Sequence, residues 1–260
     1  LCTVVSVTPV SAKERDSMSN SMEYTYAVAR IRALEVSLFS NATIDQLMAC
    51  QTYEQCLQFL AERGWGDGET NPEAEAMLAR EEEKIWEIVE ELSIDMEKFD
   101  VLSYPKLFHN LKAAIKEVCT EETTPHIFYE DVSIPGKEML EIVREKDFGR
   151  LPPNMREAAG EAYDTLLHTR DGQLCDVIID KAALTVIHQA GEEAKDAIIR
   201  DYAESTVAVA DIKIAVRSQK TAKSLEFMKR AMAECGSINV DRLAKAALGG
   251  MDTIREYLSE

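Results

Sequence analysis

The chain has 260 residues, of which 46% are hydrophobic and 29% charged, and its formal net charge is −18. This acidity argues against a nucleic-acid ligand, because phosphate contacts require clustered Lys and Arg side chains; it favours a basic protein partner or simple solvation of the surface. With only 11 glycines and 7 prolines, the chain has too few turn residues for an all-β protein, so its composition predicts long helices.

The first 21 residues, Leu1 to Ser21, show no helical period. They also lack the basic start and the long apolar stretch of a signal peptide. We interpret 1–21 as a leader or an added extension, with the natural start at Met18 or Met22, and expect a single all-helical domain over 22–260.

A first long helix is predicted from Glu23 onward, because apolar residues share one of its faces. These residues are Val28, Ile31, Leu34 and Leu38. Two short helices should follow, since Thr43 with Gln46 and Thr52 with Gln55 match the capping-box pattern. The glycines of the sequence Gly64-Trp65-Gly66-Asp67-Gly68 predict a flexible turn after them.

Asn71-Pro72 is typical of a helix start and should open a long acidic helix that ends near Tyr104-Pro105. We expect one apolar face on this helix, formed by Leu78, Ile85, Trp86, Val89, Leu92, Met96 and Phe99. Its acidic cluster, Glu81 to Glu83, is interpreted as a solvated helix face, because successive residues point to different sides and cannot converge on one substrate atom.

Further interruptions are predicted at Thr123-Thr124-Pro125 and at 149–153, where a Gly and two prolines occur. From Glu161 to Glu234 the pattern predicts nearly continuous helix. We expect breaks or kinks near Arg170-Asp171-Gly172 and near Gly191.

A weak internal repeat links three helical segments, YAVARIR at 26–32, NLKAAIK at 110–116 and DIKIAVR at 211–217. Each has Ile or Val at its sixth position and Arg or Lys at its seventh, and each precedes a loop and a short Leu-rich helix pair. The repeat suggests three similar units, at about 22–75, 76–165 and 166–260. Coincidence among amphipathic helices, which share one period, is the alternative.

The order of these segments resembles the C-subunit family of V/A-type ATPases (ATP synthases), which is equivalent to the d-subunit family of eukaryotic V-ATPases. YAVARIRALE followed by IDQLMACQTYEQCLQFLAERGW is similar to the start of that family. HNLKAAIKEV and DIKIAVRSQK are similar to its second and third Asn-Leu/Ile-Lys helices. The resemblance runs from about Glu23 to the end of the chain.

This resemblance implies an all-α, soluble funnel of three similar helical units with pseudo-threefold symmetry. It implies a non-catalytic protein, monomeric in isolation, that links the central stalk to the membrane rotor ring. Its partners would be the stalk proteins and the ring of a complex that couples proton or sodium transport to ATP synthesis or hydrolysis. Its place would be cytoplasmic, peripheral to the membrane through that complex.

Two departures from the family pattern stand out. Asp211 occupies a position where the pattern leads us to expect Asn, which should alter one local hydrogen bond. The chain also stops at Glu260, inside the third predicted unit, which we therefore expect to be incomplete.

The sequence offers no constellation for catalysis, for a cofactor or for a metal. The histidines 109, 126, 168 and 188 lack the spacing of helical metal sites and are interpreted as hydrogen-bonded structural residues. Gly136-Lys137 is no phosphate loop, because Asp131 replaces the first Gly and Glu138 the Ser or Thr. The six cysteines form no C-x-x-C pair and are interpreted as reduced, mostly buried thiols of a cytosolic protein.

The repeated basic residues Arg32, Lys112 and Arg217 are the most interesting positions. They could line a funnel or bind an acidic partner. We favour pairing with carboxylates on neighbouring helices, since semi-buried cations in a helical bundle normally require such partners. For the whole chain, a helical scaffold or adaptor unrelated to rotary ATPases is the alternative function, and a small helical enzyme is disfavoured.

Overall fold

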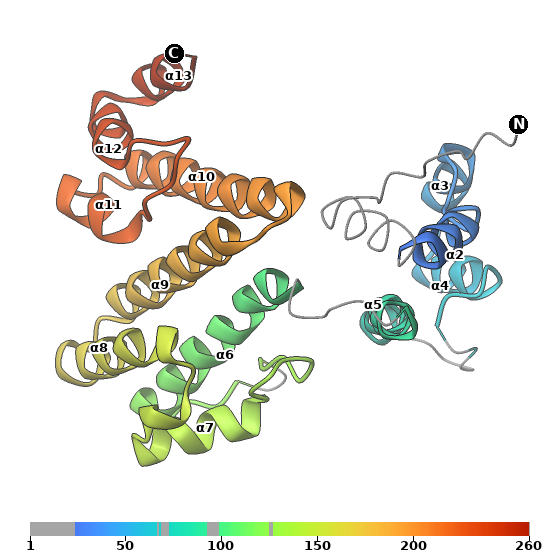
Figure 1. Cartoon of the computed structure of the whole chain (residues 1–260), viewed down its shortest axis with the longest axis horizontal. Coiled ribbons are helices and arrows are strands. Elements are labelled where there is room, and N and C mark those ends of the chain that lie inside the picture. Colours follow the sequence, from blue (N-terminus) through green and yellow to red (C-terminus); the bar gives the residue numbers. More distant parts are fainter. Residues whose placement is uncertain (1–23, 67, 69–72, 93–98, 125–126, 260) are drawn as a thin grey trace, which may run out of the picture. The chain divides into compact units, whose positions relative to one another are not determined.

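The structure is a computed structural model that describes residues 24–66, 68, 73–92, 99–124 and 127–259. Every regular element in these residues is a helix, which confirms the predicted all-α class. The chain divides into two compact units, one in the first 95 residues and one from residue 96 onward (Figure 1). The predicted leader over 1–21 lies outside the described residues. The three-unit division and the pseudo-threefold funnel stay predictions.

The first unit contains four helices in its described part, α2 (Thr25–Glu35), α3 (Asn41–Met48), α4 (Tyr53–Ala61) and α5 (Ala74–Glu91). Thr52 begins α4 as predicted, because its side chain accepts a hydrogen bond from the Gln55 backbone N–H at 3.3 Å. The predicted cap at Thr43 is wrong: α3 is capped by Ser40, whose Oγ accepts from the Thr43 N–H at 3.2 Å. The predicted start at Asn71-Pro72 lies outside the described residues.

The glycine turn after α4 is anchored by α5. Lys84 donates to the carbonyls of Gly64 and Gly66 at 3.2 and 3.0 Å, and Glu81 accepts from the Gly66 N–H at 2.9 Å. Both glycines have positive φ, a conformation that other residues rarely adopt. Glu81 is therefore a structural contact and not part of a solvated face, in contrast to the prediction.

The second unit contains α6 (Asp100–Thr120), α7 (Gly136–Glu145), the 3-10 helix η2 (Phe148–Arg150), α8 (Pro153–Thr169), α9 (Gly172–Glu193), α10 (Ala197–Lys220), α11 (Leu225–Ala231), α12 (Val240–Gly249) and α13 (Met251–Ser259). Helix α9 is central and packs against α6, α8, α10 and α11 (Figure 1). Its buried residues include Val177, Ile179, Val186 and Ile187. These buried residues lie around much of the circumference of α9, as expected for a helix that other helices cover on several sides.

The helix ends follow the predicted interruptions in part. The chain breaks between Thr120 and Gly136, between Glu145 and Pro153, and at Arg170-Asp171, as predicted. Pro105 does not end a helix, because it lies inside α6. The break expected at Gly191 comes after Glu193, and a further break after Lys220 has no Gly or Pro to signal it.

Gly191 lies in α9 where α10 approaches most closely. A Cβ added to Gly191 would lie 2.3 Å from the Cβ of Ala203 on α10. Carbon atoms normally approach to about 3.5–4.0 Å. The absence of a side chain at Gly191 therefore allows these two helices to pack closely, and α9 continues through this residue to Glu193.

Two apolar clusters form most of the interior of the second unit. The first is formed by residues of α6, α7, α8 and α9, with Leu111, Ile115 and Met155 fully buried. The second is formed by residues of α10, α11, α12 and α13, with Met228 and Leu243 fully buried. Burying each such side chain contributes about 1.5–3 kcal/mol, so these clusters supply much of the stability of the unit.

Candidate partner-binding groove

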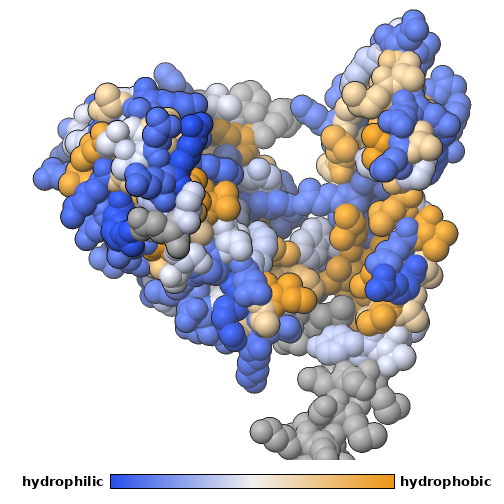
Figure 2. All heavy atoms as spheres, turned by 90° about the horizontal axis from the view of Figure 1, so that it is seen from above, coloured by the Kyte–Doolittle hydropathy of each residue, from blue (hydrophilic) through white to orange (hydrophobic). Residues whose placement is uncertain are grey.

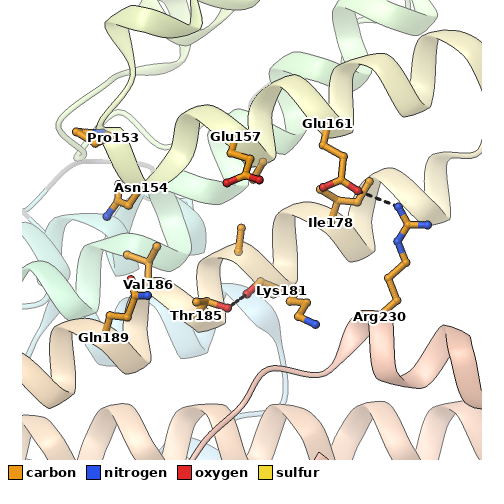
Figure 3. Close-up of a pocket in the computed structure, with 12 residues that line it drawn as sticks. Pro153, Asn154, Glu157, Glu161, Ile178, Lys181, Thr185, Val186, Gln189 and Arg230 are labelled. Atoms are coloured by element: carbon orange, nitrogen blue, oxygen red, sulfur yellow. Dashed lines mark hydrogen bonds and ion pairs between the residues drawn. The ribbon is translucent and has the colours of Figure 1, made fainter.

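A groove on the second unit is formed by α8, α9 and α11 and has a volume of about 510 Å³ (Figure 3). Its apolar lining includes Ala158, Ile178, Ala182 and Val186. Ile178 and Val186 also belong to the core of the unit, so the floor of the groove is a rigid part of the fold.

Charged side chains of both signs line this groove. Arg230 of α11 pairs with Glu161 of α8 at 2.9 Å (Figure 3). Lys181 of α9 donates to the Lys229 carbonyl at 3.2 Å, and Glu157 lies on the same side of α8 as Glu161. An apolar floor with a polar border is the anatomy of a protein–protein contact. Sequence periodicity did not predict this groove, because residues from three separate helices create it.

The three repeated basic residues do not come together in a common site. Lys112 pairs with Asp180 of α9 at 2.7 Å, which confirms the predicted pairing with a neighbouring helix. Arg32 pairs instead within its own helix, with Glu35 at 2.7 Å. Arg217 is exposed and has no ion pair within the described ranges. By its place in the repeat Lys116, and not Lys112, corresponds to Arg32 and Arg217.

Lys116 also forms an ion pair with α9, to Asp176 at 2.6 Å. The two lysines of NLKAAIK thus both serve the α6–α9 contact. Such partly exposed pairs contribute little stability, typically about 0–1 kcal/mol. They align the two helices more than they stabilise the fold.

Three of the four histidines are hydrogen-bonded, as predicted. His109 lies 2.9 Å from the Ile127 carbonyl, His168 lies 2.7 Å from the Asp164 carbonyl, and His188 lies 3.1 Å from Glu204. His126 lies outside the described residues. No metal-binding group of His, Cys, Asp and Glu occurs in the described part of the chain.

Gly136 owes its identity to packing, since a Cβ there would lie 2.3 Å from the Cβ of Phe128. Only two of the five described cysteines, Cys119 and Cys175, are buried, so the prediction of mostly buried thiols is wrong for the described part of the chain. Burial raises the pKa of both thiols, and that of Cys175 to about 12, with the charge of Asp176 adding to this effect. Both are therefore protonated and unreactive at neutral pH. Cys50, Cys56 and Cys235 are partly exposed, and Cys2 lies outside the described residues.

The first unit exposes several large apolar side chains, which are visible on its surface in Figure 2. Val28, Ile31 and Leu38, predicted to share one face of the first helix, are 56, 43 and 74% exposed. Leu78 and Ile85 of α5 are exposed as well. The predicted period holds for Val28 and Ile31, but Leu38 lies beyond the end of α2 at Glu35.

Two carboxylates of α10 bind the segment between α11 and α12. Glu204 accepts hydrogen bonds from the backbone N–H groups of Gly236, at 3.1 Å, and Ser237. Burial alone would raise the pKa of Glu204, but these bonds and the one from His188 outweigh it and lower the pKa to about 2. Asp211, farther along α10, accepts from the Ala233 N–H at 3.1 Å.

Comparisons with known proteins agree with the sequence resemblance. A family model described as ATP synthase (C/AC39) subunit matches residues 27–260. The C-subunit of the V-type sodium ATPase of Enterococcus hirae is 22% identical over 241 residues, which are 91% of this chain and 73% of that protein. No solved structure matches the chain. Among the described helices, none combines the length and the apolar character needed to cross a bilayer.

Proposed function

This chain belongs to the ATP synthase (C/AC39) subunit family, and on that premise we propose that it is a non-catalytic coupling protein that links the central stalk of a V/A-type rotary ATPase to its membrane rotor ring. The match of the family model over nearly the whole chain carries this proposal. The same match speaks against an unrelated helical scaffold. The proposed location is the cytoplasmic side, peripheral to the membrane through the complex.

A mechanical role is consistent with what the described residues offer. The charged side chains that line the groove are engaged in part with one another or with backbone carbonyls, as in the Arg230–Glu161 pair and the Lys181 bond to Lys229. Catalysis requires convergent titratable groups around one reacting atom. The groove instead offers a rigid apolar floor, which suits torque transmission through a packed contact.

We assign one stalk contact to the groove of α8, α9 and α11. Its occupant would be a helical segment of the stalk. A helix that presents an apolar stripe flanked by charges of both signs would match the apolar floor and the charged border of the groove. This assignment is separable from the coupling role, since the stalk could also bind elsewhere on the protein.

The coupling role is tested by mixing the purified chain with the cognate stalk proteins and following complex formation by size-exclusion chromatography and interferometry. We expect a complex that forms faster at low salt, as the net charge of −18 implies for a basic surface on the partner. Absence of a complex at every salt concentration, with all components folded, would refute the coupling role.

Thr185→Arg tests the groove, because Thr185 lines it from α9 and Arg is a better helix former than Thr. We expect about tenfold weaker binding or more, corresponding to about 1.4 kcal/mol. Thr123→Arg is the matched control, with the same charge change at an exposed position outside the groove. Equal binding by both variants would leave the coupling role intact and refute the groove assignment.

Calorimetric titration with Mg-ATP separates a mechanical role from a nucleotide-binding one. We expect no heat of binding, because the sequence lacks a phosphate loop with its Mg²⁺ ligand. Micromolar affinity would contradict a non-catalytic role.

A further inference from the structure

Two polar side chains of the second unit are completely buried at the same place in the internal repeat. Asn110 begins NLKAAIK on α6 and Asp211 begins DIKIAVR on α10, and both have 0% exposure. Burial of a polar group is costly unless its hydrogen bonds are satisfied. The free-energy cost of burying each of these side chains therefore depends on the hydrogen bonds that it makes.

Asn110 satisfies both ends of its amide with the loop that precedes α7. Its Oδ1 accepts from the Tyr129 N–H at 2.9 Å, and its Nδ2 donates to the carbonyls of Tyr129 and Ile134 at 2.7 and 3.3 Å. An amide suits this loop because it presents one acceptor and two donors.

Asp211 meets an equivalent segment, the one that precedes α12. Its Oδ1 accepts from the Ala233 N–H at 3.1 Å. Tyr129 and Ala233 each lie seven residues before the first residue of the next helix, Gly136 or Val240. Both helices have ten residues and are preceded by a buried isoleucine, Ile134 or Ile238.

Asn110 and Asp211 differ in the other polar atom of the side chain, which is Nδ2 in Asn110 and Oδ2 in Asp211. Asp211 Oδ2 is buried, and within the described residues it has no hydrogen-bond partner. It corresponds to the Nδ2 of Asn110, since Oδ1 of each side chain accepts from the backbone N–H of the equivalent residue. An ionised carboxylate cannot donate, whereas a protonated one has a single O–H donor and resembles an amide in shape.

No cation lies within hydrogen-bond distance to neutralise an ionised Asp211, as far as the described residues extend. Burial raises the pKa of Asp211 to about 6, the Ala233 N–H and Lys181 of α9 oppose this shift, and Glu234 adds to it. Lys181 donates to the Lys229 carbonyl, and the Cys235 thiol, also near Asp211, brings no positive charge.

Two ion pairs on the surrounding elements involve groups other than Asp211. On α10 and α9, Glu204 pairs with His188. Lys229 of α11 pairs with Asp241 of α12 at 2.5 Å. The immediate surroundings therefore favour the neutral form of Asp211.

We propose that Asp211 binds the segment 232–239 in its protonated form, as the Asn110 amide binds 127–134, and that loss of this proton weakens the packing of α11 and α12 on α10. The contact between Asp211 and 232–239 is therefore pH-sensitive, and this property is separate from the proposed coupling function. The direction follows from linkage: the folded protein keeps a proton on Asp211 that the opened segment releases, so the contribution of Asp211 to closure is complete below pH 4 and is lost as pH rises through about 6.

Glu204 acts on the same segment with the opposite charge. It binds Gly236 and Ser237 as an anion, so its contribution is complete above pH 5 and is lost only in stronger acid. Between pH 5 and pH 8 the contribution of the Glu204 carboxylate is therefore nearly constant. His188, which contacts Glu204, is present in the wild-type protein and in an Asp211→Asn variant alike, so a difference between the two in this window reports on Asp211.

Asp211→Asn is the decisive variant, because it supplies the amide found at Asn110. Hydrogen exchange of 232–239, corrected for the intrinsic pH dependence of exchange, measures the opening of the segment at pH 5 and pH 8. We expect the opening constant of the wild-type protein to rise about tenfold over this range relative to that of the variant. Urea midpoints should follow the same order, with the variant more stable at pH 8.

The reciprocal variant, Asn110→Asp, is the matched control in the other loop. It should introduce a pH-dependent opening of 127–134, with the same sign, that the wild-type protein lacks. Equal pH profiles for the wild-type protein and Asp211→Asn would overturn the proposal. It would also be overturned if Asp211→Asn failed to fold or opened more readily at every pH, since an amide should replace a protonated acid.

Discussion

Alanine substitution at two helical glycines should change stability in opposite directions. Gly160 lies within α8, and a Cβ added there meets no atom within 4 Å. Gly160→Ala should therefore stabilise the protein by about 0.5–1 kcal/mol, because alanine loses less conformational entropy in a helix. Gly191→Ala has the same intrinsic benefit but places its Cβ 2.3 Å from that of Ala203.

The cost at Gly191 follows from this distance. To restore an ordinary carbon contact, α9 and α10 must separate by about 1.2–1.7 Å. Overpacking of this kind costs about 1–3 kcal/mol, which exceeds the gain in helix propensity. We expect a net loss of about 1–2 kcal/mol, so that the two variants differ by about 1.5–3 kcal/mol, or about 3–12 °C in melting temperature.

Thermal and urea denaturation followed by circular dichroism measure both variants under one set of conditions. The double variant Gly191→Ala with Ala203→Gly removes the clash and should recover part of the lost stability, despite the cost of a new glycine in α10. If Gly191→Ala stabilised the protein as much as Gly160→Ala does, the close packing of α9 on α10 would be refuted.

Three further predictions concern other parts of the chain. Asn110→Ala should destabilise the second unit by about 3 kcal/mol in urea titrations, because it leaves the backbone groups of Tyr129 and Ile134 without their buried partner; a loss below about 1 kcal/mol would contradict this. Glu204→Gln should cost about 2–3 kcal/mol at pH 7 and flatten the loss of stability of the wild-type protein between pH 4.5 and pH 2, since the lowered pKa stabilises the fold only while Glu204 is ionised. An unchanged acid limb would count against it. Deletion of residues 1–21 should shift the melting temperature by only a few degrees, and a large drop would mean that this segment packs into the core.

The sequence was sufficient to predict the all-α class, the family and many helix boundaries. These features depend on local chemistry: Thr52 caps the helix that follows it, and Arg170-Asp171 ends one helix and begins the next. Local signals were insufficient where the surrounding structure overrides the intrinsic preference of a residue. Gly191 suggested a break but allows close helix contact, and Thr43 suggested a cap that Ser40 supplies.

Only the tertiary structure determined what covers each helix face and where each polar side chain finds its partner. The period of Val28 and Ile31 places both on one face of α2, but a period carries no information about burial by other elements. Likewise, the repeat places Asn110 and Asp211 at matching positions, while their burial depends on loops some twenty residues away along the chain. The ionisation of Asp211 depends on the geometry of those loops, because a carboxyl group of ordinary pKa in the unfolded chain acquires its unusual one only when folding removes water from around it.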